Sequence, residues 1–427
     1  MRQRIICYLA AILMATGSFA QGGTKSPYSQ YGIGVLSDQS QGMSRGMNGT
    51  GIALRTGNEV NTLNPASYSA VDSLTMLFDA GLTGQFTNFK EGNTRKNGSL
   101  ASFEYLVGTF RLWKHLGMAL GVLPMSNVGY SYSSSTYVDQ ANGSITETYS
   151  GSGGLHQAFV GIGWRPFKPL SIGVNAAYLW GDINRSVATS STAYINSLQK
   201  QYSVSVSNYT LEFGLQWEQP IGKKDRLTLG ATYGLGHKLK ADPQLLIINT
   251  NTVSSKTDTA SFKIRNGLEL PMSVGAGLSY NHNQRILVAV DGTMQRWGAI
   301  SLPHYNSTTN SYELTGGQTM TRYKGSIGAQ WTPNPMGRSY FSLIRYRIGA
   351  GYATPYYKIN RHDGPSELSL SAGFGIPLFN KWNARSFLNI SGQWMRTSAS
   401  GFITENTFRI NVGLTFNERW FAKWRVE

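Results

Sequence analysis

The chain carries little charge, a single cysteine and no long apolar run after its first twenty positions. Only 14% of its 427 residues are charged, and its one cysteine is Cys7. The rest of the chain forms no disulfide, so an exported protein of this size must depend on a large core or a hydrogen-bonded framework. Because a helix needs about 20 apolar residues to span a bilayer, membrane-spanning helices are not expected beyond residue 20.

The first twenty residues predict a secretory signal peptide. Arg2 and Arg4 precede an apolar run over residues 5–15, and the stretch Ser18–Ala20 fits the small-x-small pattern that signal peptidase cleaves. The apolar run is too short for a transmembrane anchor. Cys7 lies inside the run, whereas a lipoprotein cysteine would follow it. We expect export through the general secretory pathway and removal of residues 1–20 after Ala20.

The net charge of +16 does not indicate a nucleic-acid partner. The basic residues are dispersed along the chain instead of clustered on one segment, and the signal peptide directs the protein away from nucleic acid. One interpretation places Lys and Arg at strand ends, facing lipid phosphates. A second interpretation is attraction of anionic ligands into the mouth of a barrel.

Alternating apolar and polar residues predict a barrel of membrane-spanning strands. Phe408, Ile410, Val412 and Leu414 alternate with polar or small residues, and a period of two residues is typical of strands. Closed barrels are the remaining way to cross a bilayer, because every backbone polar group must be paired there. Fourteen candidate strands follow one another: 73–90, 99–113, 117–133, 154–166, 170–189, 201–219, 226–246, 259–280, 284–299, 317–331, 339–354, 364–378, 384–397 and 404–418.

The connections between these strands also favour a bacterial barrel. Tight turns such as Lys114-His115-Leu116 alternate with long polar loops, expected at 134–153 and 300–316. Short turns at the periplasmic end and long loops at the extracellular end are typical of outer-membrane barrels. A soluble β-sandwich is the alternative, but its strands would be only about 5–6 residues long.

Residues 21–72 differ from the rest of the chain. They contain nine glycines and too few apolar alternations for a wall strand, yet they are too rich in apolar residues for a flexible linker. We expect them to form a compact hatch, or plug, in the barrel lumen. The predicted fold is thus all-β: a transmembrane antiparallel β-barrel of about fourteen strands over residues 73–427, plugged by residues 21–72.

The predicted plug carries a family resemblance. A small-residue stretch, Arg45-Gly46-Met47-Asn48-Gly49-Thr50-Gly51, is followed closely by Asn64-Pro65-Ala66. This pair of motifs resembles the N-terminal hatch of the FadL-type (FadL/TodX-like) outer-membrane transporters of hydrophobic compounds and of their relatives in bacterial secretion systems. The segments Leu268–Gly277 and Val288–Asp291 are similar to that family's Leu-Pro and Ala-x-Asp strands. The resemblance implies fourteen strands, an internal hatch and lateral release of an apolar molecule into the membrane.

Three features are candidates for ligand contact or gating. Asn64, Pro65 and Ala66 predict a rigid turn, for which anchoring the plug to the wall is favoured over ligand contact. Gly49 and Gly51 permit close backbone approach, but no Gly-Lys-Ser/Thr follows, as a phosphate loop would need. Pro124 interrupts the third candidate strand and lacks the donor of a ladder bond. The resemblance implies that a kink there makes a lateral exit; the alternative is a tolerated bulge.

The sequence predicts neither an enzyme nor a cofactor or metal site. The six histidines are spread singly, without the spacing of a metal site, and no nucleophile elbow is present. We therefore expect no catalytic residues.

The predicted location is the outer membrane, with its lipids and lipopolysaccharide as partners. The first functional hypothesis is binding and hatch-gated lateral transport of hydrophobic small molecules such as long-chain fatty acids. The second is a non-transporting structural or accessory subunit of a secretion or barrel-assembly complex, with other outer-membrane proteins as partners. A continuous apolar tunnel would favour transport, and a lumen filled by paired polar side chains would favour the subunit.

Overall fold

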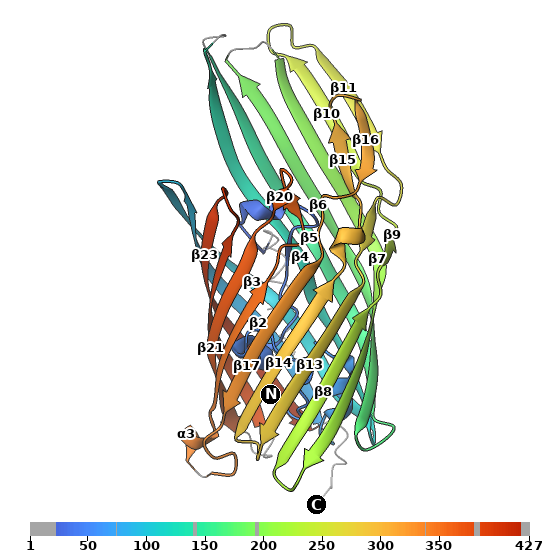
Figure 1. Cartoon of the computed structure of the whole chain (residues 1–427), viewed down its shortest axis with the longest axis vertical. Helices are drawn as coiled ribbons and strands as arrows, with labels where there is room; N and C mark the ends of the chain where they lie inside the picture. The colour runs from blue at the N-terminus through green and yellow to red at the C-terminus, as the bar shows by residue number, and fades with distance from the viewer. Residues whose placement is uncertain are drawn as a thin grey trace, which may run out of the picture.

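The computed structural model describes residues 23–73, 75–139, 143–192, 196–337, 339–379 and 385–419. The expected signal peptide, residues 1–20, lies outside these residues. In the described part of the chain, long antiparallel strands form one closed barrel (Figure 1). The first wall strand pairs with the last over sixteen positions, from Thr75–Arg419 to Lys90–Thr404.

Fourteen strands make the wall, as the alternation predicts. Each pairs antiparallel with the wall strand before and after it, so the sheet closes without a crossover. In order they are β2 (Thr75–Glu91), β3 (Thr94–Trp113), β4 (Leu116–Val138), β5 (Gly143–Trp164), β6 (Leu170–Ser191), β7 (Asn196–Ile221), β8 (Asp225–Gly234), β13 (Ser273–His282), β14 (Ile286–Gln295), β17 (Arg322–Trp331), β18 (Arg345–Ala353), β21 (Ser366–Phe379), β22 (Arg385–Ser398) and β23 (Thr404–Arg419).

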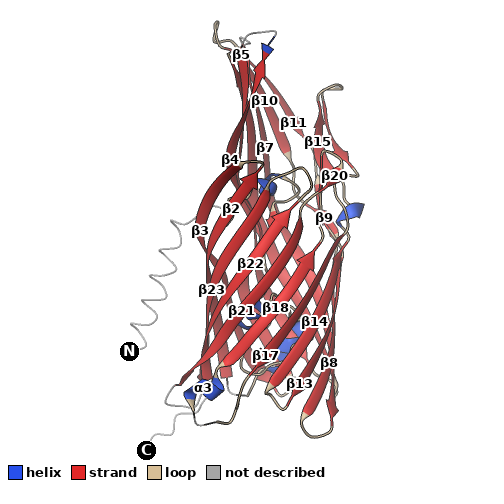
Figure 2. Ribbon diagram, turned by 60° about the vertical axis from the view of Figure 1, so that its left-hand side comes forward, coloured by secondary structure: helices blue, strands red, loops and turns tan. Residues whose placement is uncertain are grey.

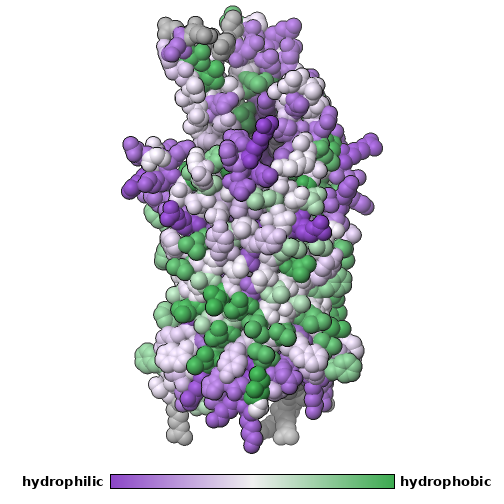
Figure 3. All heavy atoms as spheres, viewed as in Figure 1, coloured by the Kyte–Doolittle hydropathy of each residue, from purple (hydrophilic) through white to green (hydrophobic). Residues whose placement is uncertain are grey.

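The outer surface of the wall is apolar and its inner surface is polar. On β23, Phe408 and Ile410 are each 50% exposed, whereas Asn411 and Thr415, at the alternate positions of the strand, are buried toward the lumen. The same alternation recurs around the barrel, and apolar residues gather in a band over the lower half of the molecule (Figure 3). An apolar exterior band on a closed antiparallel barrel is the signature of an outer-membrane β-barrel.

The two ends of the barrel differ, which sets its orientation. At one end the strands are joined by tight turns, for example around His115 and Asn283, whose positive φ angles of 69° and 50° suit a sharp reversal. The connection between β17 and β18 is longer and includes the short helix α3 (Tyr340–Leu343). We assign this end to the periplasm and the opposite end to the cell exterior. None of the helices in the described part of the chain has the length and apolarity needed to span a bilayer.

One side of the extracellular end rises well above the rest of the barrel (Figures 1 and 2). The raised wall consists of the upper parts of β4 to β7, together with β10 (Gln244–Asn251) and β11 (Thr257–Lys263). β10 pairs with the upper part of β7 and with β11. A separate hairpin, β15 (Leu302–Asn306) with β16 (Ser311–Thr315), lies against it. We call this raised wall the extension.

Two predicted strands are wrong as single strands. The expected strand 226–246 consists of β8, the short β9 (His237–Leu239) and β10, and the expected strand 259–280 consists of β11, the short β12 (Leu268–Leu270) and β13. Pro243 and Pro271 interrupt these stretches because proline cannot donate a ladder hydrogen bond. The chain uses the interruptions to leave the barrel, build the outer edge of the extension and return.

Two predicted loops are also largely wrong. Most of the expected loop 134–153 belongs to the β4–β5 hairpin, since those strands pair from Leu116–Trp164 up to Val138–Gly143. Part of the expected loop 300–316 forms β15 and β16. Both stretches are rich in Ser, Thr and Tyr, which pair well in a strand above the membrane although they lack apolar alternation.

Candidate functional site

The N-terminal residues from 23 onward lie inside the barrel and form a plug, which is our candidate site. Its elements are η2 (Pro27–Gln30), β1 (Val35–Leu36), α2 (Gly42–Gly46) and η3 (Pro65–Ala70). α2 contacts β21, β22 and β23, whereas η3 contacts β3 to β7 on the other side of the lumen. The plug therefore reaches both halves of the wall and fills the barrel between them.

The Asn64-Pro65-Ala66 triplet is an anchor at the start of η3. Asn64 Oδ1 accepts from the Ala66 N–H at 3.0 Å, and Pro65 occupies the first helical position, where its missing donor costs nothing. Asn64 Nδ2 donates to the carbonyls of Ile52 in the plug and of Leu215 in the wall, at 2.8 and 3.1 Å. One buried side chain thus caps a helix and ties the plug to the barrel.

Wall glycines form the seat for this triplet. A Cβ added to Gly173 would lie 2.3 Å from the carbonyl carbon of Pro65, and one added to Gly163 would lie 2.5 Å from its oxygen. At Gly214 it would lie 2.1 Å from Asn64 Oδ1. Larger residues at these positions would push η3 away from the wall.

Gly49 and Gly51 lie in the plug next to wall strand β14, a few strands from the seat of the triplet. Gly49 has a positive φ of 75°, a conformation that favours glycine. The N–H groups of Gly51 and Ile52 both donate to Asp291 Oδ2 on β14, at 2.5 and 2.8 Å. Asp291 belongs to the Val288–Asp291 segment that carries part of the family resemblance. Its carboxylate stands in a wall strand because it accepts these two hydrogen bonds from the plug.

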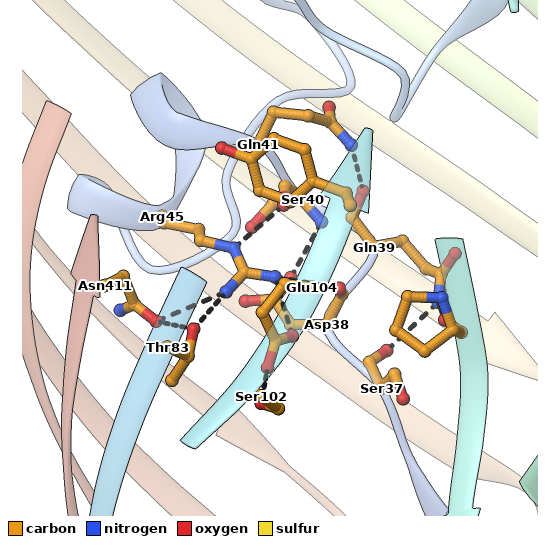
Figure 4. Close-up of polar contacts among 12 residues, drawn as sticks. Ser37, Asp38, Gln39, Ser40, Gln41, Arg45, Thr83, Ser102, Glu104 and Asn411 are labelled. Carbon is orange, nitrogen blue, oxygen red and sulfur yellow. Dashed lines mark hydrogen bonds and ion pairs between the residues drawn. The ribbon is translucent and has the colours of Figure 1, made fainter. Parts of the chain in front are cut away.

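The bonds of Asp291 form a first polar network between plug and wall. Arg45 is the centre of a second one (Figure 4). From α2 it forms an ion pair with Glu104 on β3 at 3.1 Å, and it donates to Thr83 on β2 and Asn411 on β23 at 2.9 and 3.2 Å. Nearby, burial raises the pKa of Asp38, but Lys324 and Arg45 together lower it to about 2. Asp38 is therefore charged and helps to balance the guanidinium.

A third network centres on Glu59, which is 3% exposed. Arg347 Nη2 on β18 donates to Glu59 Oε1 at 2.6 Å, and Arg345 pairs with Oε2. Arg347 also donates to Gln330 and Asn389, at 2.7 and 2.5 Å. Burial acts to raise the pKa of Glu59, but the two guanidinium groups hold it below its usual value. Three networks therefore anchor the plug at separate places around the wall.

Pro124 lies where the wall separates. The β3–β4 pairing ends at Leu106–Val122, and the β4–β5 register shifts between Pro124 and Ser126. Beyond this point, β4 pairs with plug strand β1 instead, Val35 opposite Asn127 and Leu36 opposite Ser126. Gln39 Nε2 also donates to the Pro124 carbonyl at 2.6 Å. The described residues thus contain a seam between β3 and β4, covered from inside by the plug.

Cavities lie on both sides of the plug in the described lumen, and two of them are large. The extracellular one has a volume of about 310 Å³ and is lined by apolar residues such as Leu123, Phe159 and Trp297 and by charged ones such as Asp291 and Lys324. The periplasmic one, of about 290 Å³, is mainly polar and includes Arg55 and Arg345.

The networks contain residues that the sequence analysis did not select. Arg45, Glu59, Glu104, Arg345 and Arg347 all bear charges within the plug or at lumen-facing wall positions. The wall residues among them could have been selected from the sequence, because an ionisable residue inside a membrane-spanning strand indicates a function or a buried partner. Their partners could not, because spacing along the chain does not show which residues pair. Within the described ranges, no three His, Cys, Asp or Glu side chains gather in a way that would hold a metal ion.

The family model described as BamG matches residues 1–427. The chain belongs to the BamG family. No curated protein sequence matches it. Several solved structures share the fold of this BamG-family barrel at low sequence identity.

Three of these structures, a transporter, a channel and a FadL homologue, illustrate the likeness. The Pseudomonas putida toluene transporter TodX is 15% identical, with a TM-score of 0.62 over 90% of this chain and 100% of that one. The monoaromatic hydrocarbon channel CymD is 15% identical (TM-score 0.61; 90% and 98% covered), and a Pseudomonas aeruginosa FadL homologue is 10% identical (0.60; 90% and 98%). The predicted resemblance is confirmed for the fold: the BamG-family chain has the barrel fold of the FadL-type proteins.

Proposed function

We propose that this BamG-family barrel is a structural subunit of a larger outer-membrane assembly for secretion or barrel insertion, with other outer-membrane proteins as partners. In this proposal the plug closes the barrel and gives its wall a fixed shape for docking. The supporting observation is the set of three polar networks that hold the plug, centred on Arg45, Glu59 and Asp291.

The energetics of these networks argue against an opening hatch. Removing one partner from a buried ion pair costs about 3–5 kcal/mol. A plug movement that separates Glu59 from Arg345 and Arg347 would leave two cations without their carboxylate inside the barrel. Breaking even one such pair would leave fewer than about one barrel in a hundred open.

A second candidate function is passage of a small apolar molecule. The cavity of about 310 Å³ above the plug has an apolar wall at Leu123 and Met125, next to the seam beside Pro124. A ligand entering from outside would reach the seam without crossing the plug. On this hypothesis β1 would have to leave β4, and Asn64, Pro65, Ala66, Gly49 and Gly51 would hold the rest of the plug still.

A disulfide that locks plug strand β1 to β4, beside the seam, separates the two functions. Val35 and Asn127 are directly opposite in the β1–β4 ladder, and antiparallel partners lie about 4.5–5.5 Å apart at Cα, within disulfide range. Cys7 is the sole native cysteine and lies in the expected signal peptide, so the pair Val35→Cys/Asn127→Cys would introduce the only thiols expected in the exported chain.

The structural proposal predicts that this cross-linked barrel supports growth and retains its partners on purification in mild detergent. The reduced form and each single-cysteine variant serve as controls. A barrel that purifies alone in every form would overturn the proposal. Loss of uptake of a hydrophobic probe such as toluene or oleate, reversed by a reductant, would establish the transport function instead.

A further inference from the structure

The cavity at the periplasmic mouth of the barrel has no part in the functions considered above. Its volume is about 290 Å³, comparable with the smaller ligand sites of proteins. The plug contributes residues 55–58 and Asp72 to the lining, and the inner surface of the wall contributes the rest. Gln284, Pro335 and Leu343 belong to connections that join wall strands at this end. The cavity therefore lies between the plug and the periplasm.

The lining of this cavity carries more positive than negative charge. Three arginines line it, Arg55, Arg226 and Arg345, against a single carboxylate, Asp72. The described turns around the mouth contain no acid and add five further cations: Lys114, Lys168, Lys223, Lys224 and Arg285. Asp225, at the start of β8, already pairs with His282 at 2.6 Å. A cleft lined by one sign of charge concentrates ligands of the opposite sign.

The ion pairs of Arg55 do not cancel its charge. Its partner Glu218 on β7 is shared with Arg165, at 3.6 Å from Arg55 Nε and 3.3 Å from Arg165 Nη2. Arg165 and Arg226 both repel the Arg55 guanidinium. The Arg55 side chain is only 5% exposed, yet its Nη2 has no hydrogen-bond partner among the described residues. One carboxylate thus serves two guanidinium groups on this side of the cavity.

The other side of the cavity shows the same surplus. Arg345 on β18 shares the carboxylate of Glu59 with Arg347. Its guanidinium carbon lies 4.0 Å from the centroid of the Phe387 ring, which keeps the group at the lining. Here too, one carboxylate serves two guanidinium groups.

Arg226 is a cation of this cavity that the barrel leaves unpaired. Its side chain points into the lumen, because Thr228 and Gly230, at the alternate positions of β8, are buried there. Arg226 is exposed, and within the described ranges its guanidinium forms no hydrogen bond or ion pair. All of its donors are therefore free for a ligand.

We propose that this cavity binds a carboxylate-bearing segment of a periplasmic protein. A guanidinium group binds a carboxylate through two parallel hydrogen bonds, and Arg226 is free to form them. The amides of Asn281 and Gln284 lie on the same lining and both donate and accept, as a peptide backbone requires. Pro335 and Leu343 supply apolar contacts for neighbouring side chains of the segment.

Two other anions fit this cavity less well. A lipid headgroup of the surrounding leaflet has no path to it, because unbroken ladders from β8 through β13, β14 and β17 to β18 separate the cavity from the membrane. Inorganic phosphate would use the arginines but leave the amides and the apolar residues without contact. The inference does not rest on the structural role proposed above, because a barrel of either function can hold a peptide at its periplasmic mouth.

Binding of labelled hexapeptides to the purified full-length barrel tests the proposal. The probes are a peptide of alternating glutamate and alanine and its analogue with glutamine in place of glutamate. We expect the glutamate peptide to bind with a Kd below about 1 mM. The glutamine analogue should bind at least about tenfold more weakly, because it lacks the charge-assisted hydrogen bonds. Equal binding of both peptides, no binding of the glutamate peptide, or its displacement by an equal concentration of inorganic phosphate would overturn the proposal.

Two variants with the same loss of charge show whether the cavity is the site. Arg226→Gln should weaken binding of the glutamate peptide at least about tenfold, and the barrel should still fold because this side chain makes no bonds of its own. Lys114→Gln removes an exposed cation from the β3–β4 turn at the same end, outside the lining, and should leave binding within twofold. Equal weakening in both variants would mean unspecific attraction and would overturn the proposal.

Cross-linking locates the bound peptide directly. A photo-cross-linking residue in place of Gln284, on the lining, should capture the glutamate peptide. The same residue in place of Asn97, on the extracellular β2–β3 hairpin, should not. Capture at Asn97 without capture at Gln284 would place the peptide outside the cavity and overturn the proposal.

Discussion

Glu59→Ala tests whether the buried networks hold the plug. The substitution removes the carboxylate that pairs with Arg345 and Arg347, whose side chains are 15% and 1% exposed. Because it leaves two cations without this counter-charge inside the barrel, we expect a loss of about 3–5 kcal/mol in the free energy that holds the plug in place. The wall ladders do not involve this side chain, so the barrel itself should still assemble.

Hydrogen exchange of plug amides measures this effect. The Leu54 N–H bonds to the Gly51 carbonyl at 3.0 Å, and the Asp72 N–H bonds to the Gly57 carbonyl at 3.1 Å. Both should exchange about two to three and a half orders of magnitude faster in the variant, since 1.4 kcal/mol corresponds to a factor of ten. Wall amides on β21 to β23 report whether the barrel is intact.

A matched variant separates this effect from a general one. Glu313→Ala removes an exposed glutamate from the β15–β16 hairpin, above the plug. Exchange of the plug amides should stay within twofold of the wild type there. If Glu59→Ala changes plug exchange by less than tenfold while the wall remains protected, the ion pairs do not hold the plug and the reasoning fails.

Further predictions concern the anchor, the seam and pH. Gly173→Ala should displace η3 and make the plug sensitive to protease, whereas Gly84→Ala, whose Cβ would meet nothing within 4 Å, should not. Asn64→Ala removes a helix cap and the bonds to Ile52 and Leu215; plug exchange should rise in proportion to about 2–4 kcal/mol, and no rise would contradict the anchoring role. Pro124→Ala should change the urea midpoint of the barrel little, because the adjacent register shift absorbs the missing donor; a large change would show that the kink stabilises the wall. The depressed pKa of Asp38 contributes stability above its ordinary value of 3.8 that is lost as pH falls through about 2. Protease resistance of the plug should therefore be equal at pH 7 and pH 5, and a decline between them would refute this charge state.

The architecture could be predicted from local patterns because each wall strand is defined by its own alternation. Phe408 to Leu414 show this period without any knowledge of neighbours, and the number and order of wall strands are confirmed. The extension could not be predicted in this way. Its outer face lies in water instead of lipid, so Ser150 or Gln201 carries no apolar signal, and the same polar composition also describes a loop.

The polar networks between the plug and the wall could not be predicted from the sequence. Glu59 and Arg347 are 288 positions apart, and Arg45 and Asn411 are 366 apart. Only the closure of the barrel brings them together. The motif at Asn64–Ala66 was recognisable because its cap and its proline act within three residues, whereas its seat of wall glycines was not.

The plug also has a consequence for the order of folding. It is the first part of the described chain, but Arg45 completes its bonds only when Asn411 on β23 arrives. Joining segments this far apart is entropically expensive, and contacts of such long range form late. During biogenesis the plug must therefore wait, incompletely held, until the final strand closes against β2. The pairing of β23 with β2 closes the wall and also completes the bonds that hold the plug. A barrel that has not closed therefore does not hold its plug in place.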